Sequence, residues 1–464
     1  MNVLDDAPKP HFVLVPFMAQ GHTIPMIDMA HLLVKHGALV SFITTPGNAT
    51  RIESTIDRAR ELNLPIQFVP LKLCSATIGH PDGYESVDKV SDKEQLKRLI
   101  DAYGMLHEPL VSYLRAQSNP PSCIISDLCQ PWTGDVARQL GIPRLMFNGF
   151  CAFSSLCRYI IHQEKVFENV SDDNELTVLP GFPHRIEVSK ARSPGNFNQP
   201  GFERFGEKIL KEERRADGVV TNSFYELEPL YHEAYQKKIG KKVWSLGPMF
   251  LCNIDTSALT VRGDKPSIDE RHCLQWLDSM KLGSVLYVSF GSMARTVLSQ
   301  IEEIAYGLEA SMSPFLWVIK SDDKHSDIDK LLAEGFEDRI RGRGLIIQGW
   351  APQAMILSHP SLGEQFLNEK LILDTLKTGV SVGVQSITTR TMKAQEISIV
   401  NRDQIERAVL KLMGEEIDAE ERRMRAVELK QKATQAINGG SSYNNVQDLV
   451  EYVMTRGNVN ISSV

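Results

Sequence analysis

Short apolar runs alternate along this chain with longer stretches of helical periodicity, and this alternation limits the fold more than any other feature. The runs at 12–16, 38–43 and 123–125 are too short for helices and are typical of buried strands. Between them, apolar residues recur at helical spacing, most clearly over 94–114. Strands separated by helices of this length predict βαβ units and a parallel sheet. The same pattern predicts further strands at 66–69, 145–147, 219–220 and 243–246.

The alternation stops between residues 247 and 267. This stretch is irregular and contains two prolines and two glycines, which is typical of an interdomain linker. A second series follows, with strands expected at 284–290, 315–319 and 345–347. The fold class is therefore α/β, with two open domains and the cleft between them as the expected ligand site. The expected division is 1–246 for the first domain, 247–269 for the linker, 270–438 for the second domain, and 439–464 for a C-terminal helix and tail that packs back on the first domain.

The second half breaks the alternation at one place. A short helix expected at 352–357 is followed, after His359-Pro-Ser-Leu-Gly363, by a second helical pattern over 365–377 and a strand over 380–384. Two helices thus meet without a strand between them. In a βαβ series this is anomalous, because the second helix lacks its own incoming strand.

Charge and composition exclude several classes of protein. The formal charge of −7 gives no basic field that would attract nucleic acid. The 7 cysteines include no C-x-x-C pair, which argues against a structural zinc site and favours reduced thiols in the cytoplasm. Neither an apolar run long enough to span a membrane nor a signal peptide is apparent, so we expect neither a membrane span nor secretion.

Gly21-His22 lies where the first strand ends and the first long helix begins. In an open α/β sheet, ligands bind at this carboxyl edge. The positive end of the helix dipole disfavours imidazolium, so we expect a neutral His22, as a general base must be. A histidine that only caps the helix or faces solvent is the alternative interpretation.

Asp127 follows the strand at 123–126 and precedes a helix that begins near Pro131. In a doubly wound sheet, the first and fourth strands lie side by side at the switch point. We therefore expect Asp127 to approach His22, orient its imidazole and stabilise the imidazolium form. The alternative is an ordinary aspartate that caps a helix.

Two motifs of the second half are candidates for nucleotide binding. Ser289-Phe-Gly-Ser292 ends the first strand of that half, and its glycine and hydroxyls suit a close approach to phosphate. Trp350-Ala-Pro-Gln353 follows the third strand, where an indole can stack on a base and an amide can bind its polar edge. An ordinary strand–helix turn and a core tryptophan are the respective alternatives.

The chain resembles the plant family-1 UDP-glycosyltransferases, which glycosylate small secondary metabolites. The resemblance runs from about residue 11 to 454 and includes P-F-M-A-Q-G-H-T-I-P-M-I-D-M-A, S-D-L-C-Q-P-W-T-G-D-V-A and V-L-Y-V-S-F-G-S. It also includes the opening of the family's signature box, W-A-P-Q-A-M-I-L-S-H-P-S-L-G, and the ending N-G-G-S-S-Y-N-N.

For the fold, the resemblance implies a GT-B arrangement, with the acceptor in the N-terminal domain and the UDP-sugar in the C-terminal domain. His22 then matches the general base that deprotonates an acceptor hydroxyl, and Asp127 its orienting partner. The acceptor oxygen attacks the anomeric carbon opposite UDP, with inversion. Helix dipoles and side chains bear the diphosphate charge, so no metal and no cofactor are implied.

The resemblance also assigns the donor site. Ser292 lies by the phosphates, Trp350 stacks on uracil, and Ala351 and Gln353 lie beside the uracil and ribose. Glu364 and Gln365 match the pair that contacts sugar hydroxyls, and a glutamine there suggests glucose. The implied ligands are a UDP-sugar and a small hydrophobic acceptor such as a flavonoid or terpenoid, bound by a cytoplasmic monomer.

The chain departs from the family where the alternation is broken. In the family, a strand, an H-C-G-W-N-S motif, a helix with a ribose-binding glutamate, another strand and W-P precede E-Q-F-x-N-E. Here Gly363 is followed directly by Glu364, so roughly 28 family residues have no counterpart, about one strand–helix–strand segment. The C-terminal domain is then incomplete, several donor contacts are absent, and Glu364 and Gln365 are displaced.

Two functions follow from these observations. The first is an inverting, UDP-glucose-dependent glycosyltransferase. The alternative is an impaired descendant that binds a small ligand without transferring sugar. A nicotinamide-dependent oxidoreductase has little support, because the loop M-A-Q-G-H-T after the first strand lacks the glycine fingerprint.

Overall fold

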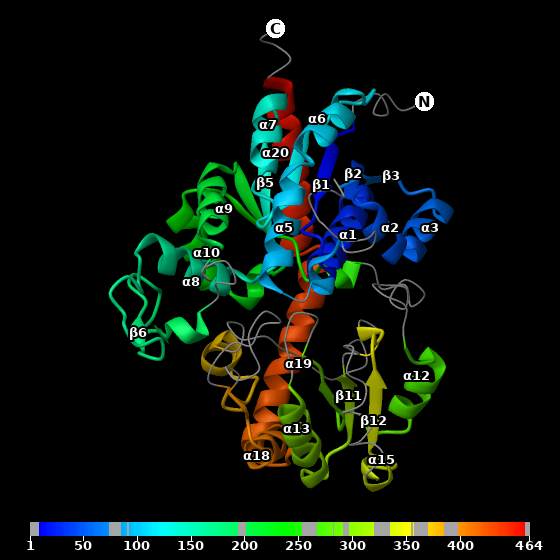
Figure 1. Cartoon of the computed structure of the whole chain (residues 1–464), viewed down its shortest axis with the longest axis vertical. Coiled ribbons are helices and arrows are strands. Elements are labelled where there is room, and N and C mark those ends of the chain that lie inside the picture. The colour runs from blue at the N-terminus through cyan, green and yellow to red at the C-terminus, as the bar shows by residue number, and fades with distance from the viewer. Residues whose placement is uncertain are drawn as a thin grey trace.

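The computed structural model describes residues 9–73, 85–90, 92–193, 201–252, 267–281, 283–290, 297–319, 335–353, 356, 370–384 and 398–459. Figure 1 shows two α/β domains, with helix α19 (Ile417–Ile437) running between them and α20 (Ser441–Val459) continuing along the N-terminal one. The α/β class predicted from the sequence is confirmed.

The N-terminal sheet has seven strands in the order β3-β2-β1-β4-β5-β8-β9. Every neighbouring pair is parallel. The strands are β1 (His11–Val15), β2 (Leu39–Thr44), β3 (Ile66–Pro70), β4 (Cys123–Asp127), β5 (Arg144–Asn148), β8 (Gly218–Thr221) and β9 (Val243–Ser245). Each matches a predicted apolar run. The chain therefore winds outward on both sides of β1, and the expected pairing of the first and fourth strands is confirmed.

Helices pack on this sheet because the apolar faces of the helices and of the sheet are stabilised by burial against each other. They are α1 (Gln20–Lys35), α2 (Pro46–Arg51), α3 (Glu53–Glu61), α5 (Lys93–Gly104), α6 (His107–Arg115), α7 (Thr133–Leu140), α8 (Ala152–Gln163), α9 (Glu203–Arg215) and α10 (Pro229–Ile239), with short turns η1 (Val87–Lys89), η2 (Lys190–Arg192), η3 (Tyr225–Leu227) and η4 (Met249–Cys252). The single helix predicted over 94–114 is divided into α5 and α6, which meet just after Gly104. A small antiparallel hairpin pairs β6 (Thr177–Val178) with β7 (Glu187–Val188).

The described C-terminal sheet has three parallel strands in the order β10-β11-β12. Its elements are β10 (Leu286–Val288), β11 (Phe315–Ile319) and β12 (Gly344–Gln348), with helices α12 (Glu270–Asp278), α13 (Leu298–Ala310), α15 (Phe336–Arg339) and α18 (Arg402–Met413) and the π-helical turn η5 (Leu371–Leu376). In Figure 1 the arrow of β12 points toward the N-terminal domain.

The two sheets differ around their first strands. In the N-terminal sheet, β1 has β2 on one side and β4 on the other. In the described part of the C-terminal sheet, β10 pairs with β11 alone. This sheet thus reproduces the half built from β1, β2 and β3, and no described strand occupies the position that β4 has in the first domain.

The strand predicted over 380–384 is wrong, because the structure shows irregular backbone there. Strands need a neighbour to satisfy their backbone N–H and C=O groups, and the described sheet offers none beyond β10. Gly383 also has φ +86°, which is outside the strand region. Of the helix predicted over 365–377, the described part forms η5, and 365–369 lie outside the described residues.

Helix α20 packs against the N-terminal sheet. Its Val446, Leu449 and Val453 are fully buried in the cluster that contains Trp244 of β9. The Trp244 Nε1 donates to Oδ2 of Asp448 at 2.6 Å. Gly439 and Gly440 lie between α19 and α20, and Gly439 adopts φ +89° there. None of the helices in the described ranges combines the length and apolar composition that a membrane crossing needs.

Candidate functional site

The carboxyl edge of the N-terminal sheet brings His22 and Asp127 together. His22 is the third residue of α1, which follows β1, and Asp127 is the last residue of β4. Since β1 and β4 are paired, with Val15 opposite Ser126, the two side chains leave the sheet at the same point. The His22 Nδ1 lies 2.7 Å from the Asp127 Oδ2. The expected approach of these residues is confirmed.

Asp127 is fixed through both carboxylate oxygens. While Oδ2 faces His22, Oδ1 accepts a hydrogen bond of 2.8 Å from the backbone N–H of Cys129. The side chain is fully buried, whereas the His22 side chain is 30% exposed. Helix α7 begins only at Thr133, so Asp127 is not its capping residue. Asp127 therefore forms its hydrogen bonds with His22 and with the loop after β4.

The pKa of His22 is raised above its ordinary value of 6.5. Burial lowers the pKa, but the negative charge of Asp127 and its hydrogen bond raise it by more. The direction of this shift is therefore opposite to the one expected from the helix dipole. A carboxylate at hydrogen-bond distance outweighs the partial charge of a helix terminus.

The hydrogen-bond geometry selects one nitrogen of His22 as a base. An ionised carboxylate only accepts hydrogen bonds, so Nδ1 donates its hydrogen to Asp127. Nε2 then carries the free lone pair, and no hydrogen bond to it is found among the described residues. This arrangement suits a base that takes a proton from a bound hydroxyl.

The loops that hold the pair are tied together. Gln130, after β4, donates from Nε2 to the Pro16 carbonyl after β1 at 2.8 Å. The Met18 carbonyl accepts from the Val87 backbone at 2.8 Å and from the Ser86 hydroxyl at 2.9 Å. Both loops are therefore fixed before α1 begins, which restricts where His22 can point.

Two contacts of the pair were not predicted from the sequence. The Phe17 ring packs edge-on against the His22 ring, with centroids 5.4 Å apart, and Cys129 supplies the N–H to Asp127. The contact with Cys129 has a signal in the local sequence, since an aspartate after a strand often accepts a hydrogen bond from the backbone N–H two residues later. Phe17 had none, because an aromatic residue after a buried strand is typical of any core.

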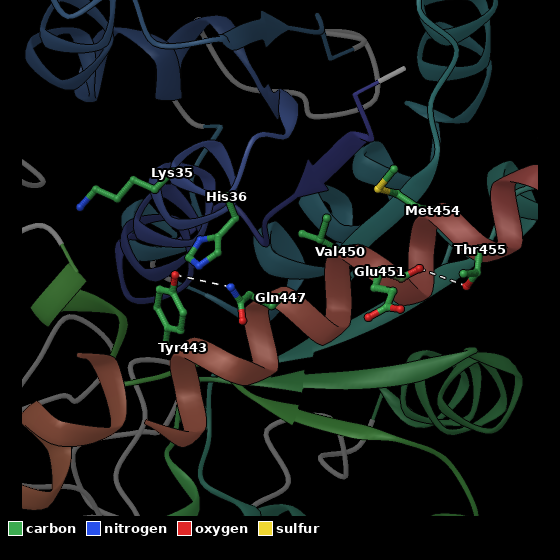
Figure 2. Close-up of a pocket in the computed structure, with 8 residues that line it drawn as sticks. All are labelled: Lys35, His36, Tyr443, Gln447, Val450, Glu451, Met454 and Thr455. Atoms are coloured by element: carbon green, nitrogen blue, oxygen red, sulfur yellow. Dashed lines mark hydrogen bonds between the residues drawn. The ribbon is translucent and has the colours of Figure 1, made fainter. Parts of the chain in front are cut away.

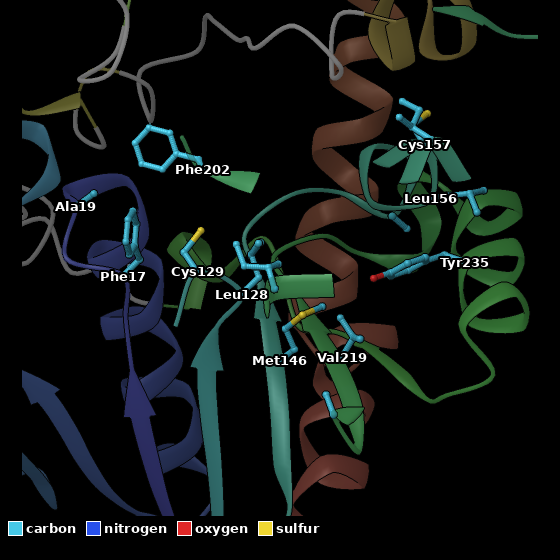
Figure 3. Close-up of a cluster of buried hydrophobic side chains, with 14 of the residues drawn as sticks. Phe17, Ala19, Leu128, Cys129, Met146, Leu156, Cys157, Phe202, Val219 and Tyr235 are labelled. Carbon is cyan, nitrogen blue, oxygen red and sulfur yellow. The ribbon is translucent and has the colours of Figure 1, made fainter. Parts of the chain in front are cut away.

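Around this pair lies the large apolar cluster of the N-terminal domain. Figure 3 shows Phe17, Leu128 and Cys129 of the loops by the pair, with Phe202 nearby. All four side chains are buried. The site thus combines one polar pair with apolar surroundings, which is the usual composition of a small-molecule site.

The second half places part of the expected nucleotide site at the end of β12. The Ser267 N–H donates a hydrogen bond to the Trp350 carbonyl at 2.8 Å, and the Ser267 hydroxyl accepts one from the Trp350 N–H at 3.0 Å. Ala351 is fully buried, and the Gln353 N–H donates to its carbonyl at 2.7 Å. The Trp350 Nε1 has no hydrogen-bond partner among the described residues. This nitrogen is buried, so the indole N–H is an unsatisfied donor within the described part of the chain.

Three expected site residues, Ser292, Glu364 and Gln365, lie outside the described residues. Within the described ranges, no group of three or more His, Cys, Asp or Glu side chains could hold a metal ion.

A hollow of about 610 Å³ lies elsewhere on the N-terminal domain. Figure 2 shows it between the end of α1, at Lys35 and His36, and α20, at Tyr443, Val450 and Met454. His22 is in the first turn of α1 and Lys35 ends it, so the hollow is about 20 Å from the pair at 1.5 Å per residue. It is separate from the candidate active site.

Comparisons with known proteins give a consistent result. A family model described as "UDP-glucoronosyl and UDP-glucosyl transferase" matches residues 239–396. UDP-glycosyltransferase 73C11 of Barbarea vulgaris is 40% identical, and the alignment covers 96% of each chain. The crystal structure of Glycyrrhiza uralensis UGT73P12 complexed with glycyrrhetinic acid 3-O-monoglucuronide has a TM-score of 0.88 and 32% identity, covering 98% of this chain and 97% of that one. That of Arabidopsis thaliana UGT89C1 complexed with UDP has a TM-score of 0.70 and 28% identity, covering 96% and 100%.

The alignment with the Barbarea enzyme contains gaps in this chain. It runs over 476 positions, more than the 464 residues of this chain. The relative therefore has residues at positions where this chain has none. The likeness over nearly the whole length extends to both domains and gives the chain the GT-B fold. This chain belongs to the plant family-1 UDP-glycosyltransferases.

Proposed function

We propose that this protein transfers glucose from UDP-glucose, with inversion, to a hydroxyl of a small plant secondary metabolite such as a flavonoid or terpenoid. The observation that carries the proposal is the hydrogen bond of 2.7 Å between His22 and Asp127 at the carboxyl edge of the N-terminal sheet. His22 is the catalytic base and Asp127 its orienting partner.

In the proposed reaction, the Nε2 atom of His22 takes the proton of the acceptor hydroxyl. The acceptor oxygen forms a bond to the anomeric carbon from the face opposite UDP. The bond between that carbon and the diphosphate oxygen breaks, and UDP leaves with the electron pair. The charge of Asp127 stabilises the imidazolium as it forms. The raised pKa of His22 fits this role, because a stronger base accepts the proton more readily.

We assign the donor to the C-terminal domain. Trp350 stacks on uracil through an indole whose N–H is unpaired among the described residues, and Ala351 and Gln353 contact the uracil and ribose. Ser292 would lie by the phosphates, and Glu364 and Gln365 by the glucose hydroxyls. No metal takes part in this proposal.

The proposed acceptor is a small hydrophobic molecule, since apolar side chains surround the pair. Phe17 contacts the His22 ring directly, and Leu128 and Cys129 line the loop after Asp127. Such surroundings favour an aromatic or terpenoid body with one hydroxyl aimed at the base. The protein is proposed to act as a monomer in the cytoplasm, where its cysteines stay reduced.

The test is a product assay with UDP-glucose and a panel of phenolic and terpenoid alcohols. We expect one glycoside for each UDP released, with the β configuration at the anomeric carbon as inversion of an α-linked donor requires. Glycosides with the α configuration would refute the single displacement, and a complete lack of product would refute the proposal.

A second candidate function is a protein that binds the acceptor but transfers no sugar. Two observations favour it: no described strand pairs with β10 on the side away from β11, and the alignment with a relative contains positions that this chain lacks. Each lost charge-assisted contact to a diphosphate would weaken donor binding by about 1.5–3 kcal/mol.

Thermal melts separate the two functions. Saturating UDP raises stability by about 2.7 kcal/mol at a hundredfold excess over Kd. An upward shift with UDP supports the transferase. A shift with acceptor alone, and none with UDP, supports the binding protein.

A further inference from the structure

A short segment of the C-terminal half contacts the N-terminal domain. Residues 370–377, here called the docking segment, contain η5. Beyond it the chain returns to the C-terminal core, where Val384 packs beside β11 and α13. At the end of the segment, the Lys377 carbonyl accepts a hydrogen bond of 2.9 Å from Arg425 of α19. The segment thus belongs to the C-terminal domain in sequence but reaches across to the other domain.

Leu371 is the apolar anchor of the docking segment. It is 2% exposed and belongs to the same cluster as Phe153 and Leu156 of α8 and Tyr231 of α10. Lys370 lies near Cys157 of α8, since its charge opposes the rise that burial causes in the pKa of that thiol. Side chains of the N-terminal domain therefore bury the start of the docking segment.

The hydroxyl of Tyr231 joins three separate parts of the chain. It lies 2.9 Å from the Thr375 hydroxyl and 3.3 Å from Nδ1 of His184. Its ring is 2% exposed and packs against Phe153, at 4.8 Å between centroids, and Phe182, at 5.6 Å. Phe182 and His184 lie in the loop between β6 and β7. Helix α10, this hairpin loop and the docking segment therefore meet at one hydroxyl group.

We propose that Tyr231 and Thr375 are positioning residues that fix the C-terminal domain and the β6–β7 hairpin against each other. This inference rests on the proposed function in one respect: the reaction needs a sugar carbon held by one domain to meet an oxygen held at His22 of the other. Small errors in the relative position of the two domains would lower the reaction rate, because the reacting atoms must start about 3–3.5 Å apart.

The first test is hydrogen exchange on the full-length protein, which needs no activity. Two amides report on the contact: the Thr378 N–H donates to the Ile372 carbonyl in the docking segment, and the Leu179 N–H donates to the Ile186 carbonyl in the hairpin. In Thr375→Val or Tyr231→Phe we expect both amides to exchange about 2- to 10-fold faster, the effect of one hydrogen bond. Thr375→Ser keeps the hydroxyl and should restore the wild-type rates.

Matched controls make the same Thr→Val and Tyr→Phe changes at positions outside the Tyr231–Thr375 contact. Thr434→Val removes a hydroxyl that bonds within α19, to the Lys430 carbonyl. Tyr225→Phe removes a hydroxyl bonded to Glu233 of α10. Neither should change the Thr378 or Leu179 amide. The double variant Tyr231→Phe/Thr375→Val should resemble Tyr231→Phe alone, because that substitution already breaks the bond to Thr375.

The inference is overturned if the Thr378 amide exchanges without protection in the wild type, or if both single variants leave the two amides unchanged. The second readout is kinetic: Thr375→Val should lower kcat with the Kd for UDP unchanged, and Thr375→Ser should recover kcat. An equal loss of UDP binding in Thr375→Val would contradict a positioning role. If even the wild type transfers no sugar, the proposed function fails, while the exchange rates still decide whether the segment is docked.

Discussion

The Nδ1 atom of His22 and the Oδ2 atom of Asp127 lie 2.7 Å apart, although 105 residues separate them in sequence. The pairing of β1 with β4 makes this contact. A buried carboxylate held by the Cys129 N–H thus faces a partly exposed imidazole, and the negative charge raises the pKa of the ring.

Replacing Asp127 with Asn should change the pH dependence of the reaction. In the wild type the rate should rise with pH as His22 loses its proton, with an apparent pKa above 6.5. Without the carboxylate charge the pKa of His22 falls, so the rising limb should move to lower pH. The plateau rate should drop about 10²- to 10⁴-fold, because the imidazolium loses its partner. Initial rates from about pH 5.5 to about pH 9 measure both effects.

Asp135→Asn is the control for this substitution. Asp135 lies on α7 and pairs with Arg138 at the surface, so the pH profile should stay in place. A rising limb that does not move in Asp127→Asn would contradict the assignment of the limb to His22.

The same pKa shift affects stability. A folded-state pKa raised above that of the unfolded chain means that the folded state binds the proton more tightly. This stabilisation is fully present below about pH 6.5 and is lost as the pH rises through the folded-state pKa. Asp127→Asn should therefore cost more stability at about pH 5.5 than at about pH 9. Urea unfolding at both pH values measures it, and an equal loss at both would show that Asp127 acts only through packing.

Trp350→Ala should weaken UDP binding. Stacking of a base on an aromatic ring is worth about 1–3 kcal/mol, so Kd should rise about 5- to 150-fold. Trp350→Phe keeps an aromatic face and should lose less. Calorimetric titration with UDP measures these constants. If Trp350→Ala binds UDP as the wild type does, uracil does not stack on this indole.

Leu449→Ala should destabilise the N-terminal domain even though Leu449 lies near the end of the chain. The side chain is fully buried against the sheet, so its truncation should cost about 2–5 kcal/mol. Leu410→Ala, at a leucine that is 48% exposed, should stay within about 0.5 kcal/mol of the wild type. Equal effects would mean that α20 does not pack in solution as described.

Much of the N-terminal fold could be predicted from the sequence, because each strand is a short apolar run. The meeting of His22 with Asp127 followed only once a doubly wound order was assumed, since no local pattern tells which strands become neighbours. The direction of the His22 pKa shift could not be predicted from the helix dipole alone. It depends on a charge brought close by the tertiary fold.

The second half shows where local patterns fail. Residues 380–384 are apolar enough for a strand, but a strand needs a neighbour, and the described sheet ends at β10 on that side. Leu371 has the pattern of an ordinary helical core residue. That its core belongs to the other domain depends on how the two domains lie against each other, which no periodicity encodes.

The most direct test of the proposed chemistry compares UDP release by the wild type, His22→Ala and His36→Ala, each with UDP-glucose and an acceptor. His36 follows α1 at its far end, where its Nδ1 contacts the Leu32 carbonyl, so its variant controls for loss of a histidine. We expect acceptor-dependent release by the wild type and His36→Ala, and a loss of about 10²- to 10⁴-fold in His22→Ala. Equal release by His22→Ala, or none that depends on the acceptor in the wild type, would contradict the assignment of His22 as the base of a sugar transfer.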